Sequence, residues 1–391
     1  MNARVGLVVL ATSLLSAPGC TTVRRAPSLP DDATSRRLLV GNLQDSISAI
    51  LQAGVRDSAF PGAVAVVGTS RGAVVTSAVG RLDWGPSRPP STSTLWDLAS
   101  LTKVIALTSS MMLLVESRAV DLNAPVQRYL PEFQGRWKEG VTVRHLLTHS
   151  SGLPSWRPLY KEADGPANAM ALAISTPLDT VPGARMVYSD LGVIILGEVV
   201  TRVSGQPFEA FVRERVFAPL AMHETMFRPD SSLRERIAPT EVDPWRQRHL
   251  RGEVHDENAY ALGGVSAHAG LFSSATDLIR IARMYLEAGT LDGRRFVSPT
   301  TIDQFTAVQD SSLSHRALGW ETPNGTNSAG RLMSKRAFGH TGFTGTSLWI
   351  DREQGVFILL LTNRVNPTRE RRGITAVRVA VADATMRVVL R

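Results

Sequence analysis

The chain contains little cysteine and little lysine for its 391 residues. Cys20 is the only cysteine, so no disulfide can form within the chain. The 43 basic residues are almost all arginine, and lysine occurs only at positions 103, 138, 161 and 335. Arginine does not lose its proton in a protein, so a position that needs an exchangeable proton cannot follow this preference for arginine. The lysines are therefore the basic residues to consider for proton transfer.

The apolar run near the start, Val5 to Leu15, is too short to span a bilayer as a stable helix. It follows the positive charge of Arg4 and precedes small residues, which is the pattern of an export signal. Cys20 stands where a bacterial lipoprotein is cleaved and acylated, although the usual leucine three residues earlier is missing. We expect residues 1–20 to direct export to the periplasm or outer envelope, with a lipid anchor at Cys20. A secreted product without lipid is the alternative.

No nucleic-acid recognition motif accompanies the formal net charge of +8, and the arginines are dispersed along the sequence. A protein that binds nucleic acid would gather its basic residues or carry such a motif. We therefore expect no nucleic-acid partner. An anionic envelope surface and a merely solvated basic surface both explain the charge.

Composition predicts one large folded domain after a short tether. With 43% hydrophobic residues, the chain can bury a substantial core. Residues 21–37 are rich in Pro, Ser, Asp and Arg and have no apolar period, so we expect a flexible tether. We expect the domain to occupy residues 38–391, where no repeat or low-complexity tract interrupts it.

Two helices and four short strands near the chain ends predict an α+β fold. Residues 39–55 and 374–390 have apolar residues typical of helices. The β-rich runs, which favour an antiparallel sheet, are residues 63–67, 73–79, 347–350 and 356–361.

A mostly helical region should be inserted into this sheet-containing part. We expect the α/β part at about 38–99 and 332–391, and the helical part at about 100–331. One helix of the insertion is indicated by a capping box at Ser274 and Asp277, followed by an apolar run to Leu286. The predicted architecture is an antiparallel sheet flanked by terminal helices.

Ser100 and Lys103 are spaced so that one turn of helix would bring them together. Lys103 is the only charged residue between Asp97 and Glu116, in a segment that is otherwise apolar or small. Such a helix is buried, and a buried ammonium needs partners. We expect desolvation to lower the pKa of Lys103, so that its neutral amine can activate Ser100 as a nucleophile. Alternatively, Ser100 caps the helix and Lys103 reaches the surface.

Several segments resemble the serine β-lactamase and penicillin-binding-protein superfamily. Residues 98–103, LASLTK, are similar to its nucleophile motif. Residues 121–131 and 145–153 resemble the class C-like branch, which includes family VIII esterases and DD-peptidases. Together with the motifs described next, the resemblance covers roughly residues 40–391. It implies a β-lactamase/transpeptidase-like fold and an acyl-enzyme at Ser100, with no cofactor.

The superfamily's second motif, Tyr-x-Asn, is matched by Tyr188, Ser189 and Asp190. The resemblance implies that Tyr188 relays protons between Ser100 and the leaving group, provided that a cation such as Lys103 lowers its pKa. Asp190 replaces the asparagine that usually contacts the substrate amide, and it adds negative charge. Alternatively, Asp190 caps the apolar helix that follows, and Tyr188 only packs in the core.

The third motif, Lys-Thr-Gly, appears as His340, Thr341 and Gly342, followed by Phe343. The resemblance places this segment on a strand beside the pocket, with the backbone amides of Ser100 and Phe343 as the oxyanion hole. His340 would donate to substrate or to Tyr188, or it would be a hydrogen-bonded turn residue. A histidine is largely neutral at pH 7, so recognition of a substrate carboxylate should weaken. Efficient penicillin hydrolysis is not expected.

Residues 254–272 resemble a segment of penicillin-binding-type esterases and of an N-acetylmuramyl-L-alanine amidase branch. Glycines 263 and 264 would let the backbone approach a pocket closely. The resemblance favours a small-molecule or peptidoglycan-fragment substrate. The expected function is an exported serine hydrolase that acts on esters or amides.

Two alternatives remain open from the sequence. A metallohydrolase is the first, but residue 146 is leucine and the glutamate of His-Glu-x-x-His is absent. Its potential ligands would be His145, His149, His255, Asp256, Glu257 and His268. We expect no metal, and structural hydrogen bonds for these histidines. The second alternative is a slow β-lactam-binding or peptidoglycan-sensing protein, acylated at Ser100 and deacylated slowly.

Overall fold

The computed structural model describes residues 33–391, so the predicted signal, Cys20 and most of the tether lie outside the described residues. Its main sheet has five antiparallel strands in the order β10-β11-β12-β1-β2. Both ends of the chain contribute, as predicted. The strands are β1 (Gly62–Thr69), β2 (Gly72–Gly80), β10 (Phe338–Thr341), β11 (Ser347–Asp351) and β12 (Val356–Thr362).

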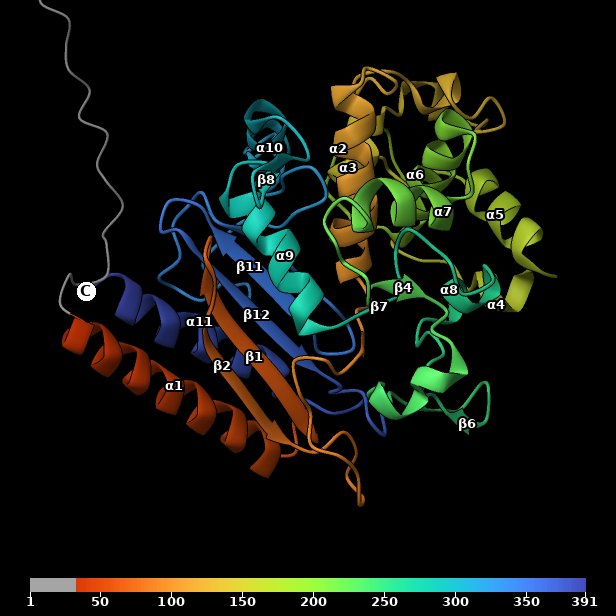
Figure 1. Cartoon of the computed structure of the whole chain (residues 1–391). Coiled ribbons are helices and arrows are strands. Elements are labelled where there is room, and N and C mark those ends of the chain that lie inside the picture. Colours follow the sequence, from red (N-terminus) through yellow and green to blue (C-terminus); the bar gives the residue numbers. More distant parts are fainter. Residues whose placement is uncertain (1–32) are drawn as a thin grey trace, which may run out of the picture.

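Helices cover both faces of this sheet (Figure 1). The terminal helices α1 (Ala33–Arg56) and α11 (Ile374–Val389) pack together on one face, and α9 (Ala275–Leu286) packs on the other. The central strands β1 and β12 are almost entirely buried, which explains their continuous apolar sequences. The predicted α+β architecture is confirmed.

Two predicted boundaries differ from the structure. Helix α1 begins at Ala33, so residues 33–37, expected in the tether, are helical. The last proline before them is Pro30, and extending an existing helix costs little. Helix α9 lies within the predicted helical part, yet it packs against β12 and β1. Its cap is Ser274, as predicted, but the Asp277 carboxylate binds Thr225 and the Glu224 N–H instead of completing a capping box.

The remaining part between β2 and β10 is mostly helical. Its α-helices are α2 (Ser109–Glu116), α3 (Val143–Leu147), α4 (Leu159–Glu162), α5 (Pro166–Ser175), α6 (Asp190–Ser204), α7 (Phe208–Val212), α8 (Glu257–Ala261) and α10 (Pro299–Thr306). The 3-10 and π segments are Lys103–Thr108, Val126–Arg128, Lys138–Gly140, Arg213–Phe217 and Ser231–Arg236. Short strands are β3 (Trp96–Asp97), β4 (Met226–Phe227), β5 (Val242–Asp243), β6 (Arg248–His249), β7 (Leu271–Ser273), β8 (Thr290–Leu291) and β9 (Arg294–Arg295).

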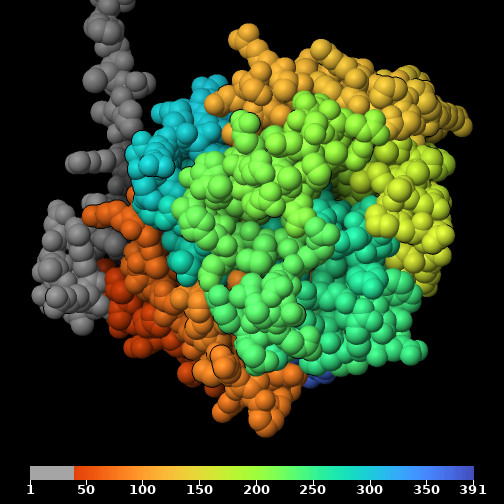
Figure 2. Space-filling view, turned by 45° about the vertical axis from the view of Figure 1, so that its right-hand side comes forward, coloured from red at the N-terminus to blue at the C-terminus, as the bar shows by residue number. Residues whose placement is uncertain are grey.

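A large shared core joins the inserted region to the sheet. Buried residues of β1, β12 and β10 belong to the same apolar cluster as those of α2, α6 and α9. In the space-filling view, the inserted segments cover most of the visible face (Figure 2). No helix within residues 33–391 combines the length and apolar character needed to cross a bilayer.

The small sheet β3-β7-β4 places the predicted nucleophile. Strand β3 pairs with β7, so Asp97 lies opposite Phe272 and the chain then turns into the helix that begins at Leu101. Ser100 lies between this strand and this helix. The segment just before β7 is thereby brought beside the first turn of the helix.

We predict that Gly339→Ala destabilises the fold. Gly339 lies on β10 opposite Trp349, and a Cβ there would overlap the Trp349 ring and the Leu348 carbonyl. Overpacking of this kind costs about 1–3 kcal/mol of unfolding free energy. Gly41→Ala in α1, where a Cβ meets open space, should stabilise the protein by about 0.5–1 kcal/mol. Thermal and urea unfolding of both variants would measure these opposite shifts.

Candidate active site

Ser100 is held at the start of a helix by a constrained turn. Ala99 has a left-handed φ of 45°, which is uncommon for a residue with a Cβ. The buried Asp97 carboxylate stabilises this turn, because it accepts the Ala99 N–H at 2.8 Å and the His255 N–H at 2.7 Å. The nucleophile therefore has a fixed orientation.

Lys103 is 2% exposed and lies against Ser100, as the spacing predicted. Its Nζ donates to Ser100 Oγ at 2.8 Å and to the His268 carbonyl at 3.0 Å. A carboxylate oxygen of Asp190 lies 2.8 Å from the same Nζ. Two hydrogen bonds and one ion pair therefore hold the ammonium in a buried position, so the alternative in which Lys103 reaches the surface is wrong.

The expected neutral amine is also wrong for the resting protein. Burial by itself lowers the pKa of Lys103, but the negative charge of Asp190 is the largest of the effects that oppose it, and the pKa is raised. Desolvation was the only effect visible from the apolar sequence around Lys103. The carboxylate that reverses it comes from another helix, α6.

Tyr188 lies between several cationic and aromatic groups. Its ring centroid is 4.5 Å from that of His149 and 5.9 Å from that of His340, and Lys103 Nζ lies 5.0 Å from it. Burial raises the pKa of the Tyr188 phenol, and the charge of Lys103 opposes this rise without cancelling it. The expected lowering of this pKa is therefore wrong, and the phenol is neutral at pH 7.

Asp190 is the first residue of α6, and it does not cap the helix. Ser189 does so, because its hydroxyl accepts the Gly192 N–H at 3.3 Å. The capping alternative for Asp190 is thus wrong, and its carboxylate is available to Lys103. The helix N-terminus further stabilises this negative charge.

His340 lies on β10 with 1% of its surface exposed. Its Nδ1 is 2.8 Å from the Thr341 carbonyl, which can only accept, so Nδ1 carries the proton. Burial, Arg316 and Lys103 lower the pKa of His340 well below its usual value, so Nε2 is an unprotonated acceptor. No side chain or backbone group within residues 33–391 binds this Nε2. The expected donor role of His340 is therefore wrong for the resting state, because its Nε2, unpartnered within these residues, is a buried acceptor.

The loop after β10 is fastened to the segment that precedes Ser100. Thr344 Oγ1 donates to the Asp97 carbonyl at 2.7 Å, and Thr346 Oγ1 donates to the Leu98 carbonyl at 3.0 Å. A Cβ at Gly342 would overlap this same Leu98 carbonyl, so only glycine fits. Thr341, Gly342 and Phe343 thereby line one cleft with Ser100.

The backbone N–H groups of Ser100 and Phe343 are free to bind a ligand. Among the described residues, neither N–H donates to a protein acceptor. Both residues line the same cleft, and the Phe343 side chain is 49% exposed. The pair can supply the two donors that an oxyanion needs.

The cleft over Ser100 and Tyr188 is strongly cationic. Its volume is about 510 Å³. The arginines that line it are Arg316, Arg364, Arg371, Arg372 and Arg378, and Glu321 is the acidic residue in the lining. Sequence reasoning missed these arginines and inferred weak carboxylate binding from His340 alone. Only the adjacent pair Arg371 and Arg372 could have indicated them, because the others are dispersed in sequence.

The histidines considered as metal ligands have other partners. His145 Nδ1 accepts the Thr142 N–H, His149 Nδ1 accepts the Ser189 N–H, and His255 pairs with Glu241 at 2.9 Å. Within residues 33–391, no group of three or more His, Cys, Asp or Glu side chains has an arrangement suited to a metal ion.

His268 belongs to a hydrogen-bonded chain behind Lys103. Its Nδ1 is 2.7 Å from Ser266 Oγ, and its Nε2 is 2.9 Å from Asp256 Oδ1. Ser266 and His268 are buried, so this Ser-His-Asp chain is not a second catalytic centre. It orients the His268 carbonyl that accepts from Lys103.

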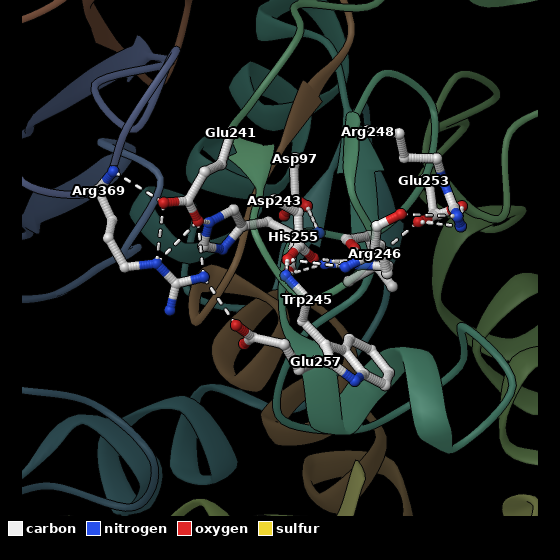
Figure 3. A network of polar contacts seen from close by, with 11 residues as sticks. Asp97, Glu241, Asp243, Trp245, Arg246, Arg248, Glu253, His255, Glu257 and Arg369 are labelled. Atoms are coloured by element: carbon white, nitrogen blue, oxygen red, sulfur yellow. Dashed lines mark hydrogen bonds and ion pairs between the residues drawn. The ribbon is translucent and has the colours of Figure 1, made fainter. Parts of the chain in front are cut away.

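A network of buried ion pairs supports the Asp97 side of the site (Figure 3). Arg369 binds Glu241, whose other partner is His255. Burial would raise the pKa of Glu241, but hydrogen bonds from His255 and Arg369 lower it. Since the His255 N–H also binds Asp97, the network connects the segment before α11 with the turn at Ser100.

The chain is similar to known hydrolases over most of its length. The sequence model of the beta-lactamase family matches residues 47–382. N-acetylmuramyl-L-alanine amidase of Bacillus subtilis strain 168 is 33% identical over 307 residues, 70% of this chain and 68% of the relative. A protein of Salmonella agona strain SL483, provisionally named D-alanyl-D-alanine carboxypeptidase, is 31% identical over 308 residues, 70% of each chain.

Solved structures show the same fold at lower sequence identity. EstCE1, described as a hydrolase with promiscuous acyltransferase activity, has a TM-score of 0.72 and 20% identity to this chain. The likeness covers 89% of this chain and 100% of EstCE1. The predicted β-lactamase/transpeptidase-like fold is confirmed.

We predict that Asp190→Asn narrows the alkaline range of activity. Without the carboxylate, burial dominates and lowers the pKa of Lys103, which loses its proton at a lower pH. If catalysis needs the ammonium, the kcat/KM of Asp190→Asn falls at a lower alkaline pH than that of wild type. Wild type keeps its activity over the same rise in pH. The pH profiles of both proteins with a nitrophenyl ester would test this. A gain of activity at neutral pH would instead identify the neutral amine as the base.

Proposed function

The chain belongs to the beta-lactamase family and is a serine hydrolase, and we propose that it cleaves an amide bond in an anionic, peptidoglycan-derived peptide through an acyl-enzyme at Ser100. The observation that carries this proposal is the cleft over Ser100, which five arginines and one glutamate line. Peptides of peptidoglycan carry free carboxylates, and a guanidinium binds a carboxylate through two hydrogen bonds. The names of the amidase and carboxypeptidase relatives support amide substrates.

In the proposed acylation step, Ser100 Oγ attacks the amide carbonyl carbon and its proton passes to Tyr188 Oη. Tyr188 gives its own hydroxyl proton to the leaving nitrogen, so the phenol is neutral before and after the step. The C–N bond breaks, the amine leaves, and an ester joins the acyl group to Ser100. Such a relay needs no free phenolate and is compatible with the raised pKa of Tyr188.

Deacylation uses the same groups in reverse. Water attacks the ester carbonyl, and its proton passes through Tyr188 to Ser100 Oγ as the acid leaves. In both steps the Lys103 ammonium stabilises the negative charge that develops on Ser100 Oγ and on the phenol. The N–H groups of Ser100 and Phe343 would bind the carbonyl oxygen as it becomes an oxyanion.

We also propose that the protein acts outside the cytoplasm, directed there by residues 1–20 and held at the membrane by a lipid on Cys20. The support is the sequence pattern around Val5 to Leu15 and Cys20. A membrane location would bring the site close to peptidoglycan fragments. Metabolic labelling with a palmitate analogue, compared between wild type and Cys20→Ser, tests the anchor.

We predict that muropeptide amides are hydrolysed in preference to nitrocefin, and that Ser100→Ala reduces turnover at least about a thousandfold. Nitrophenyl esters, D-Ala-D-Ala peptides, muropeptide amides and nitrocefin would be compared, with Ser100→Ala as the blank. Mass spectrometry would follow the adduct on Ser100. A persistent adduct without turnover would contradict this function and favour the slow sensing protein.

We predict that Arg372→Gln raises KM for an anionic muropeptide about fivefold, as expected for loss of one exposed ion pair. Arg372 lines the cleft, and the Gln side chain keeps much of its length. The KM of a neutral nitrophenyl ester should change little. Arg294→Gln, at an exposed position on β9, is the matched control. If Arg372→Gln and Arg294→Gln changed the KM of the anionic muropeptide equally, the cleft would not select substrates by charge.

A further inference from the structure

A second cleft, here named the aromatic groove, opens on the inserted region. Its volume is about 640 Å³. Tyr160, Trp245 and Tyr260 line it together with Arg228, Glu253 and the glycine pair 263–264. Both glycines have left-handed φ values, 82° and 80°, which bring backbone without side chains to the wall of the groove.

The three aromatic rings of the groove form a row that Trp156, which is not part of the groove lining, extends beyond Tyr160. The ring centroids of Trp156 and Tyr160 are 6.3 Å apart, those of Tyr160 and Trp245 are 4.6 Å apart, and those of Trp245 and Tyr260 are 5.8 Å apart. Trp156 is 47% exposed, Trp245 41% and Tyr260 38%. A contiguous row of exposed large rings marks a binding surface, because such residues normally bury their faces.

The row is built on a rigid support. The Arg246 side chain is only 3% exposed, and its guanidinium lies 5.8 Å from the Trp245 ring and 5.0 Å from the Tyr260 ring. The Asp243 carboxylate forms an ion pair with Arg246 and accepts a hydrogen bond from the backbone N–H of Trp245 at 2.7 Å. In Figure 3 the Trp245 side chain projects away from these ion pairs. The ring is therefore held in place before any ligand arrives.

Both sides of the groove connect to partners of Lys103. On one side, the Asp190 N–H binds the Ser155 carbonyl at 3.0 Å, and Trp156 is the next residue. On the other side, Asp256 caps α8, which carries Tyr260, and binds His268, whose carbonyl accepts from Lys103. The segments that carry Trp156 and Tyr260 are therefore hydrogen-bonded to residues that contact Lys103.

The two clefts differ in charge. The Ser100 cleft has five arginines and one glutamate, whereas the aromatic groove has one arginine and one glutamate. Rings that carry hydroxyl and N–H groups, beside one cation and one anion, suit a neutral ligand with apolar faces and several hydroxyls. A pyranose sugar has these properties, and a charged peptide does not.

We propose that the aromatic groove binds the N-acetylated amino sugar of a muramyl peptide while the arginine cleft binds its anionic peptide. This inference rests on the proposed function and deepens it. The bond presented to Ser100 would be the amide that joins the sugar's lactyl carboxyl to the first amino acid of the peptide. The attack then forms a lactyl ester on Ser100, and the peptide amine leaves with the proton from Tyr188.

The test compares two substrates with the same scissile amide, N-acetylmuramyl-L-Ala-D-Glu and D-lactyl-L-Ala-D-Glu, which lacks the sugar. Trp245→Leu should lower kcat/KM for the muramyl compound about tenfold and leave the lactyl compound within about twofold. Trp156→Leu, at a more exposed position, is the second variant, and circular dichroism verifies folding. Trp137→Leu, a tryptophan outside the groove, should change neither substrate.

If Trp245→Leu lowers kcat/KM equally for both substrates, or for neither, the sugar site is contradicted.

A binding measurement in which no reaction occurs tests the sugar site separately from the proposed function. The methyl glycoside of N-acetylmuramic acid, with its lactyl carboxyl converted to a methyl amide so that the probe is neutral, is titrated into Ser100→Ala. Binding is followed by tryptophan fluorescence, and Trp245→Leu in that background should abolish the signal. If the sugar binds but wild type hydrolyses neither amide, the proposed function is contradicted and the sugar site is supported. If wild type hydrolyses the amides but the sugar does not bind, the sugar site is contradicted and the proposed function is supported.

Discussion

The buried ammonium of Lys103 is the interaction on which the rest of the site depends. Its three polar partners come from three different parts of the chain: the Ser100 hydroxyl, the Asp190 carboxylate and the His268 carbonyl. Removing any of them would leave a charge or a donor unsatisfied on a side chain that is buried. The helix that carries Lys103, the start of α6 and the segment before β7 must therefore all be in place together.

Each of these parts is fastened by its own polar contacts. Asp97 holds the turn before Ser100, and the threonines after β10 bind the carbonyls of residues 97 and 98. The network around Glu241 and Arg369 then joins that turn to the loop before α11. The nucleophile and the arginine-lined cleft are thus positioned by one connected set of interactions, which makes the site preorganised.

Charge is separated between the two clefts, and under the proposed function this separation orients the substrate. Arginines gather over Ser100, while the aromatic groove has one cation, one anion and three aromatic side chains. Asp190 contributes by neutralising Lys103, so the cleft attracts anions mainly through its arginines. The departures from the family motifs therefore both change the charge: Asp190 adds a negative charge that pairs with Lys103, and His340 puts a neutral side chain in the place of a lysine.

The sequence by itself determined four of the five strands of the sheet, the terminal helices and the pairing of Ser100 with Lys103, whereas β10 was expected only from the family resemblance. These features depend on local periodicity and on the spacing of one helical turn, which a sequence displays directly. Only the tertiary structure decided the protonation states and the charge of the pocket. The carboxylate of α6 reverses the desolvation of Lys103, and arginines between positions 316 and 378 converge on one cleft. Electrostatic energy depends on distance in space, and residues far apart in the chain set those distances.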